Sequence, residues 1–278
     1  MQRVGILYHP LVNATQIKAT QIQDFLDGEG LAAWRCSSWE PDDIKAQLDG
    51  TDLILTVGGD GTILRTVQAV FPREIPITGI NMGKLGFLTE LGADEALEKL
   101  PALLSGKGWR DQRSMLAITL EQDKEAPQTF TALNDVVAAR GAIARLVHLA
   151  VTIDSQHFQT YRADGVIVAT ATGSTGYSLA AGGPILHPQS PDLILVPIAP
   201  HLSPAYPLVL PGETLLKLKI TTFHEATLSI DGHINLALGD GAEISVSRSQ
   251  RQAQLLRIHT KNLFYSSLEQ KLRGKKSL

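Results

Sequence analysis

The sequence predicts an α/β domain with a parallel sheet, followed by an all-β, sandwich-like domain. With 278 residues, the chain is longer than a typical single domain. Up to about residue 105, apolar strands alternate with helical patterns, which is typical of a parallel sheet with crossover helices. After Gly106, short β-leaning runs separated by Gly, Pro, Asp and His replace that alternation, and this pattern favours a sandwich.

The first domain is expected over residues 1–105. Its strands are predicted from compact apolar runs, and its helices from apolar residues at helical spacing. The expected strands are Val4–Tyr8, Leu53–Val57 and Ile77–Ile80, and the expected helices are Thr15–Leu26, Ile63–Val70 and Ala93–Leu104.

The second domain is expected over residues 106–254. Its β-leaning runs are Met115–Leu120, Phe130–Ala139, Leu146–Ile153, Val166–Thr170, Leu193–Ile198, Leu215–Ile220, Ala226–Ile230 and Glu243–Val246. Helical periodicity returns over Asn262–Leu272. We therefore expect the segment 255–278 to pack back on the first domain.

Composition excludes several classes of protein. The net charge of −3, with basic residues scattered along the chain, argues against a nucleic-acid binder. Cys36 is the single cysteine, so an intrachain disulfide is impossible and a reducing compartment is expected. No apolar run approaches the roughly 20 residues that a membrane-spanning helix needs. We expect a cytoplasmic protein without a membrane partner.

The segment Gly58-Gly59-Asp60-Gly61-Thr62 lies between a predicted strand and a predicted helix. Open α/β sheets bind ligands at the carboxyl ends of their strands, and glycines there let backbone N–H groups approach phosphate. The charge of Asp60 would repel a phosphate, so its presence indicates proton transfer or help in holding Mg²⁺. The alternative is a plain strand-to-helix turn in which Asp60 or Thr62 caps the helix.

Gly58–Thr62 resembles the signature shared by NAD kinases, diacylglycerol-type lipid kinases and phosphofructokinases. Further segments, in the same order along the chain, resemble NAD kinases in particular. These are Asn81–Leu88 with its Gly-Phe-Leu ending, Leu133–Val137, Asp164-Gly165 with Thr172–Ser178 and Ala181–Pro184, and Ile230–His233. The resemblance extends from about Val4 to about Ile258, which is nearly the whole chain.

The resemblance implies a two-domain NAD kinase architecture with NAD bound between the domains. It implies ATP as phosphoryl donor, with Mg²⁺, and Asp60 as the general base for the ribose 2′-hydroxyl. Asn134 and Asp135 would face the adenosine, and Tyr177 would pack on a base. The implied binding residues are Gly58, Gly59, Gly61, Thr62, Arg65, Phe87, Asn134, Asp135, Arg145, Arg162, Asp164, Thr175, Gly176, Tyr177, Ser178, Ala180 and His233. No metal ligand is assigned.

Three positions depart from the family pattern. Asp135 stands where Glu is usual, Gly176 where Ala is common, and Ala180 where Ser is usual. Each change bears on substrate affinity or preference, since none touches Asp60.

Two other functions stay open at this point. One is a lipid or other small-molecule kinase that uses the same loop, and the other is a non-catalytic NAD or NADP sensor. The sequence leaves the donor open between ATP, another nucleoside triphosphate and polyphosphate, and the acceptor open between NAD and NADH. By resemblance we also expect a homodimer or homotetramer.

Overall fold

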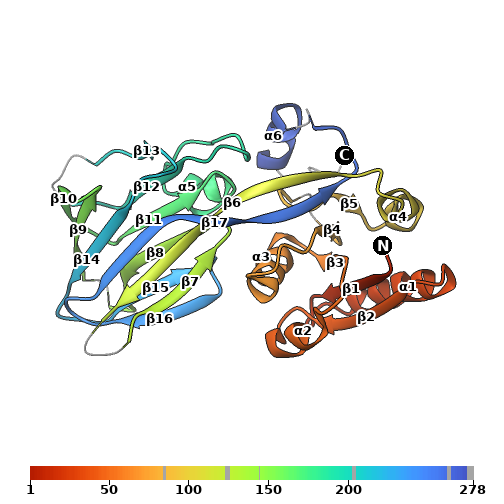
Figure 1. Ribbon diagram of the computed structural model, residues 1–278. Helices are drawn as coiled ribbons and strands as arrows, with labels where there is room; N and C mark the ends of the chain where they lie inside the picture. The colour runs from red at the N-terminus through yellow and green to blue at the C-terminus, as the bar shows by residue number, and fades with distance from the viewer. Residues whose placement is uncertain (84–85, 123–125, 144, 202–204, 262–263, 274–278) are drawn as a thin grey trace. The chain divides into compact units, whose positions relative to one another are not determined.

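The computed structural model describes residues 1–83, 86–122, 126–143, 145–201, 205–261 and 264–273. The chain forms two compact units, unit 1 (residues 1–112 and 253–278) and unit 2 (residues 113–252). It passes between them within strands β6 (Trp109–Glu121) and β17 (Glu243–Arg257) (Figure 1). The domain limits expected from the sequence, 105 and 254, lie a few residues from these boundaries and stay predictions.

Unit 1 is built on a parallel sheet with the strand order β2-β1-β3-β4. Every residue of β3 is buried, as expected for a parallel strand that is covered on both faces. The short β5 and the end of β17 also pair with β4 in parallel. The strands are β1 (Arg3–Tyr8), β2 (Ala32–Ser37), β3 (Leu53–Gly58), β4 (Ile77–Asn81) and β5 (Leu91–Gly92).

The helices of unit 1 follow the strands in alternation. The helix after β3 matters most for function, because it begins at Asp60. Its apolar side is buried through Ile63, Leu64 and Val67, which fixes its first turn against the sheet. The helices are α1 (Asn13–Gly28), α2 (Pro41–Gln47), α3 (Asp60–Val70), α4 (Ala96–Leu104) and α6 (Phe264–Arg273).

Unit 2 contains two sheets. One is antiparallel, with the order β13-β12-β11-β8-β15-β16. The other has the order β10-β9-β14-β17, with β6 next to β17 and β7 next to β6. The remaining elements are β7 (Gln128–Ala132), β8 (Asp135–Arg140), β9 (Val147–Ile153), β10 (Gln156–Ala163), β11 (Gly165–Thr170), the 3₁₀ turn η1 (Gly173–Thr175), α5 (Tyr177–Ala180), β12 (Leu193–Ile198), β13 (Leu208–Leu210), β14 (Leu216–Thr221), β15 (Ala226–Ile230) and β16 (Ile234–Leu238).

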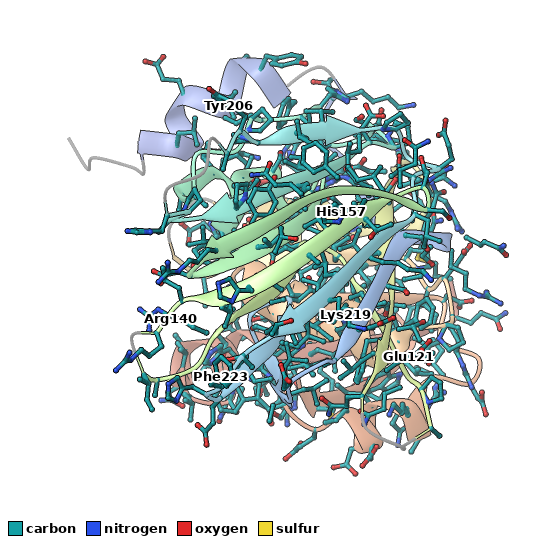
Figure 2. All side chains as sticks on the ribbon, turned by 90° about the vertical axis from the view of Figure 1, so that its left-hand side faces the viewer. Glu121, Arg140, His157, Tyr206, Lys219 and Phe223 are labelled. Carbon is teal, nitrogen blue, oxygen red and sulfur yellow. The ribbon has the colours of Figure 1, made fainter. Side chains whose placement is uncertain are left out.

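Alternating side chains form the sandwich core of unit 2. Leu216 and Leu218 of β14 are buried, whereas Lys217 and Lys219 between them are exposed, and Figure 2 shows Lys219 on the outer surface of its strand. In the opposite sheet, Val136 belongs to the same core. The next residue of each strand there points to the outer face, where Val137, Ile167 and Ile194 form a separate cluster. That outer face carries the pocket described below.

The structure departs from the sequence-based elements in one instructive place. The run Phe130–Ala139 reads as one strand, but β7 ends at Ala132 and β8 begins at Asp135, in the other sheet. The apolar pattern of the sequence gives no sign of this break between the two strands. Asn262, the expected first residue of the last helix, lies outside the described residues. None of the described helices is long and apolar enough to span a membrane.

Candidate active site

The glycine-rich loop is tightly packed at the end of β3. A side-chain carbon on Gly58 would lie 2.2 Å from the Thr62 hydroxyl oxygen, so any larger residue would collide with the first turn of α3. Gly59 and Gly61 are exposed, with open space where their side chains would be. Their backbone can therefore approach a ligand closely, as a phosphate-binding loop requires.

The Asp60 carboxylate accepts three consecutive backbone hydrogen bonds. Its Oδ2 accepts from the N–H of Phe87 at 2.8 Å, and its Oδ1 accepts from the N–H groups of Leu88 at 3.0 Å and Thr89 at 3.3 Å. A side-chain carbon on Gly86 would lie 2.2 Å from Oδ1. The predicted glycine-rich segment thus meets Asp60 at residues 86–89, whereas Lys84 and Leu85 lie outside the described residues.

Arg65 projects from α3 toward an aromatic pair. Its guanidinium carbon lies 4.9 Å from the centre of the Trp39 ring, a distance that permits cation–π attraction. The rings of His9 and Trp39 meet edge to face at 5.5 Å. His9 follows β1 and Trp39 follows β2, so this cluster lies at the carboxyl edge of the parallel sheet.

Unit 2 holds a pocket of about 600 Å³ on the outer face of its antiparallel sheet. This volume suits a ligand of nucleoside size or larger. The lining comes from β8 and the residue before it, from β15, from the turn after each of these strands, and from α5. The lining residues are Asn134, Asp135, Val137, Ala139, Arg140, Gly141, Ala142, Tyr177, Thr227, Ser229, Asp231 and Gly232.

Asp231 fixes the start of β8 by accepting three consecutive backbone hydrogen bonds, as Asp60 does in unit 1. Its carboxylate accepts from the N–H groups of Leu133 at 2.9 Å, Asn134 at 2.7 Å and Asp135 at 3.3 Å. Asp231 has a φ of 48° and Gly232 a φ of 69°, values that Asp and Gly tolerate better than most residues. These hydrogen bonds explain the break between β7 and β8, and they orient Asn134 and Asp135 toward the pocket.

Asp135 has an unusual charge state. Burial raises the pKa of its carboxyl group from 3.8 to about 7, and the neighbouring Asp231 carboxylate adds to the increase. The Oδ1 atom of Asn134 is buried without a hydrogen-bond partner among the described residues. The Asn134 oxygen is therefore available to a ligand that carries N–H or O–H donors.

Replacing Asp135 with Asn should stabilise the protein at pH 7.5 but hardly at pH 4. An unfolded Asp loses its proton near pH ~4. The folded group keeps its proton until about pH 7, so the wild type loses stability as the pH rises between these values and is level beyond them. The difference in unfolding free energy between variant and wild type should grow by roughly 2–4 kcal/mol over this range, as measured by urea denaturation.

Asp24→Asn, on the exposed side of α1, is the matched control and should show no such trend. An Asp135→Asn effect of equal size at pH 5 and pH 7.5 would contradict the assigned pKa.

Most of the other expected binding residues gather around η1 and α5. The Ser178 hydroxyl is buried without a partner among the described residues, whereas Gly176, Tyr177 and Ala180 are exposed. Thr175 bonds weakly to the carbonyl oxygen of Thr172, at 3.3 Å. Tyr177 is the member of this group that lines the pocket.

Four further expected residues of unit 2 also lie outside the pocket lining. Asp164 is next to the pocket, since it pairs with Arg140, a lining residue, at 2.7 Å. His233 follows the Asp231 turn, and its Nδ1 lies 3.1 Å from the Asp231 carbonyl oxygen. Arg145 and Arg162 are exposed, before and within the β9–β10 pair, and the structure does not bring them to the pocket.

Sequence reasoning did not assign Arg140, Thr227, Ser229 or Asp231 to the site. Asp231 belongs to the quoted Ile230–His233 segment, so a signal for it was present. Thr227 and Ser229 alternate with buried apolar residues along β15, which puts both on one face. No sequence pattern distinguishes Arg140, whose position is labelled in Figure 2.

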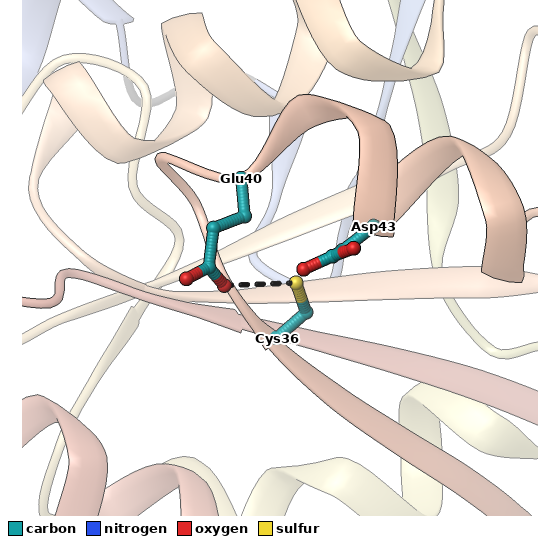
Figure 3. Close-up of side chains that lie close together, drawn as sticks. All are labelled: Cys36, Glu40 and Asp43. Carbon is teal, nitrogen blue, oxygen red and sulfur yellow. Dashed lines mark hydrogen bonds between the residues drawn. The ribbon is translucent and has the colours of Figure 1, made fainter.

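Cys36, Glu40 and Asp43 are the one group of at least three metal-ligating side chains that the described residues bring together (Figure 3). Burial and the two carboxylates raise the pKa of the Cys36 thiol to about 11, with burial the larger cause. The thiol therefore stays protonated near neutral pH and donates weakly to Glu40 at 3.7 Å. Because metals bind the thiolate, this group is poorly suited to a metal centre.

The fold and the glycine-rich loop place the protein among two-domain phosphotransferases. Two family models match the chain, the ATP-NAD kinase N-terminal domain over residues 10–108 and the ATP-NAD kinase C-terminal domain over residues 133–258. The chain belongs to the ATP-NAD kinase family.

Similar proteins cover nearly the whole chain. NAD kinase of Dehalococcoides mccartyi is 48% identical over 98% of this chain and 96% of its own length, and that of Chloroflexus aurantiacus is 40% identical over 98% and 99%. Yeast NADH kinase in complex with NADH has a TM-score of 0.87 at 27% identity, covering 100% of this chain and 89% of that one. An Archaeoglobus fulgidus NAD kinase in complex with ATP has a TM-score of 0.78 at 26% identity, covering 98% and 99%. The predicted fold class is confirmed.

Proposed function

We propose that this protein is an NAD kinase that transfers the terminal phosphoryl group of ATP to the 2′-hydroxyl of the adenosine ribose of NAD. The observation that carries the proposal is the Gly58–Thr62 loop with its carboxylate fixed by three backbone N–H groups. Unit 1 would supply this loop and unit 2 the dinucleotide pocket. Relatives that are 48% and 40% identical are named NAD kinase, which supports the proposed activity.

The chemistry of the unit 2 pocket suits the nucleoside part of NAD. Asn134 offers a buried acceptor that lacks a partner among the described residues, and Asp135, Thr227 and Ser229 add a carboxyl group and two hydroxyl groups to the lining. Adenine amino groups and ribose hydroxyls are donors that would satisfy them. Tyr177 is half exposed at the pocket and would stack on a base. An acyl chain would leave these polar groups unpaired, which disfavours a lipid acceptor.

Asp60 would act as the general base. A carboxylate offers about four acceptor positions on its two oxygens. Three are used by the N–H groups of Phe87, Leu88 and Thr89, so one remains for the substrate hydroxyl. The backbone bonds fix the direction of that position, and phosphoryl transfer depends mainly on such alignment. General-base assistance of this kind contributes roughly 10²–10⁴ to the rate.

We propose that Mg²⁺ enters with the donor, as Mg-ATP. Protein sites for Mg²⁺ often use one or two carboxylates together with substrate phosphates. Asp60 is already engaged by three N–H groups, which leaves one acceptor position, assigned above to the substrate hydroxyl. We therefore treat the ion as part of the substrate. Backbone N–H groups at Gly59 and Gly61 would meet the phosphates.

The direct test is NADP formation by the purified protein with NAD and Mg-ATP, read by an NADP-specific dehydrogenase. Turnover with ATP is the expected result, with polyphosphate and NADH as parallel substrate swaps. Clear NAD binding without turnover on either donor would favour the sensor function instead.

Thermal shift separates NAD from a lipid acceptor. NAD at 100 times its Kd should add about 2.7 kcal/mol to the unfolding free energy, whereas diacylglycerol in micelles should add nothing. The reverse result would point to a lipid kinase. A homodimer or homotetramer, expected by resemblance, is tested by light scattering on the same preparation.

A further inference from the structure

The turn formed by residues 86–90 is held from two sides. On one side, Asp60 accepts from the N–H groups of Phe87, Leu88 and Thr89. On the other, the Arg257 guanidinium donates from Nη1 to the carbonyl oxygens of Leu88 at 2.7 Å and Thr89 at 3.3 Å. The peptide unit between Leu88 and Thr89 is therefore held at both ends, by Arg257 at its carbonyl oxygen and by Asp60 at its N–H group.

Arg257 is anchored by two buried carboxylates. Its Nη1 lies 3.2 Å from Glu90 Oε2, and its Nε lies 3.1 Å from Asp111 Oδ2. The three side chains are 8%, 8% and 4% exposed, so these charges are largely removed from water. The other Glu90 oxygen accepts from the N–H groups of Ile258 and His259, at 2.8 and 2.7 Å. Glu90 thus joins the turn both to the Arg257 side chain and to the backbone that follows it.

The planar shape of the Arg257 guanidinium determines how firmly it holds the turn. Its planar fork presents donors in fixed directions, so the bond to Asp111 sets the direction in which Nη1 points. Nη1 in turn fixes the Leu88 and Thr89 carbonyls. Because a peptide unit is planar, fixing the Leu88 carbonyl also fixes the N–H group of Thr89, which donates to Asp60. A lysine ammonium, which is a single point donor, cannot span Asp111 and the turn together.

We propose that Arg257 is a positioning residue for phosphoryl transfer, which holds the 86–90 turn so that its N–H groups aim the Asp60 carboxylate. This inference rests on the proposed function of Asp60. Arg257 is buried at the end of β17 and acts through the turn, without touching the substrate. Its loss should lower kcat and leave the KM for NAD nearly unchanged, because the nucleoside pocket lies in unit 2.

The test compares Arg257→Lys with Leu26→Ala, a fully buried core change in α1 that destabilises the same unit away from the turn. Both variants should melt at lower temperature than the wild type. Arg257→Lys should lose roughly 10–100-fold in kcat, whereas folded Leu26→Ala should keep the wild-type kcat. Amide hydrogen exchange at residues 87–89 should accelerate at least about 10-fold in Arg257→Lys and not in Leu26→Ala. Added guanidinium should restore part of the kcat of Arg257→Ala.

Wild-type kcat and unchanged exchange at residues 87–89 in Arg257→Lys would overturn the inference. Should Arg257→Lys not fold, Glu90→Gln makes the same comparison, since it keeps an acceptor for the amides of Ile258 and His259 but loses the charge that pairs with Arg257. If the wild type makes no NADP, the proposed function fails, while the exchange comparison still tests whether Arg257 holds the turn.

Discussion

Replacing Asp60 with Asn should lower kcat at least about 100-fold, because the amide cannot accept the 2′-hydroxyl proton. The structure adds a second reason. Both Asp60 oxygens face backbone N–H groups, so the NH₂ of Asn meets a donor in either orientation of the amide. The Kd for NAD should stay close to that of the wild type, since the pocket proposed for its nucleoside part lies in unit 2. Steady-state kinetics and calorimetry measure the two quantities.

Asp42→Asn is the control for this substitution. Asp42 also occupies the first turn of a helix, but its side chain is exposed and pairs loosely with Lys45 at 3.5 Å. This variant should have wild-type kinetics. Near-wild-type turnover in Asp60→Asn would remove the general-base assignment altogether.

Replacing Gly86 with Ala should cost roughly 10–100-fold in kcat while leaving the Asp60 carboxylate chemically intact. The added carbon would lie 2.2 Å from Asp60 Oδ1, far inside the roughly 3.5–4.0 Å at which non-bonded heavy atoms attract. Either the carboxylate or the turn has to move, and overpacking of this kind costs about 1–3 kcal/mol of stability. Kinetics and urea denaturation of the same preparation measure both effects.

Gly92→Ala provides the comparison in the same part of the chain. A carbon there would lie 3.6 Å from the nearest Glu95 atom, which is an ordinary contact, so kcat should not change. If Gly86→Ala also kept the wild-type kcat, the position of the carboxylate would not limit the rate. Asp60→Asn tests whether the reaction needs a carboxylate, and Gly86→Ala tests whether that carboxylate must point in a fixed direction.

The sequence predicted secondary structure correctly wherever one hydrophobic pattern dominated a segment. The wholly apolar strand Leu53–Val57 and the amphipathic helix after it are examples. Strands at the edge of a sheet were not predicted. β2 consists of the mixed sequence Ala-Ala-Trp-Arg-Cys-Ser, and it is held by packing, with the Trp34 ring occupying the space above Gly5. The break after Ala132 depends on Asp231, which lies about a hundred residues further along the chain.

For the site, resemblance supplied the residue types but not their partners. Asp60 and Asp135 could be selected from motifs. That Asp60 is bonded to residues 87–89, and that Asp135 is buried near Asp231, depends on contacts across 27 to 29 and 96 residues of sequence. No local sequence pattern predicts contacts between residues that are so far apart along the chain. Arg257 lies in a strand whose sequence looks ordinary, and its partners are spread over two separate segments, the 86–90 turn and Asp111.

The return of β17 to unit 1 has a consequence for synthesis on the ribosome. The contacts between Arg257 and the 86–90 turn join residues 167 to 169 positions apart. A nascent chain released after Gln252 would contain the glycine-rich loop, Asp60 and the nucleoside pocket, yet it would lack the strand end that fixes the turn. Since domains fold as the chain emerges, with N-terminal parts first, the contacts that fix the turn form only after Arg257 has been synthesised. Incomplete translation products would then hold the substrate-binding parts without an aimed carboxylate.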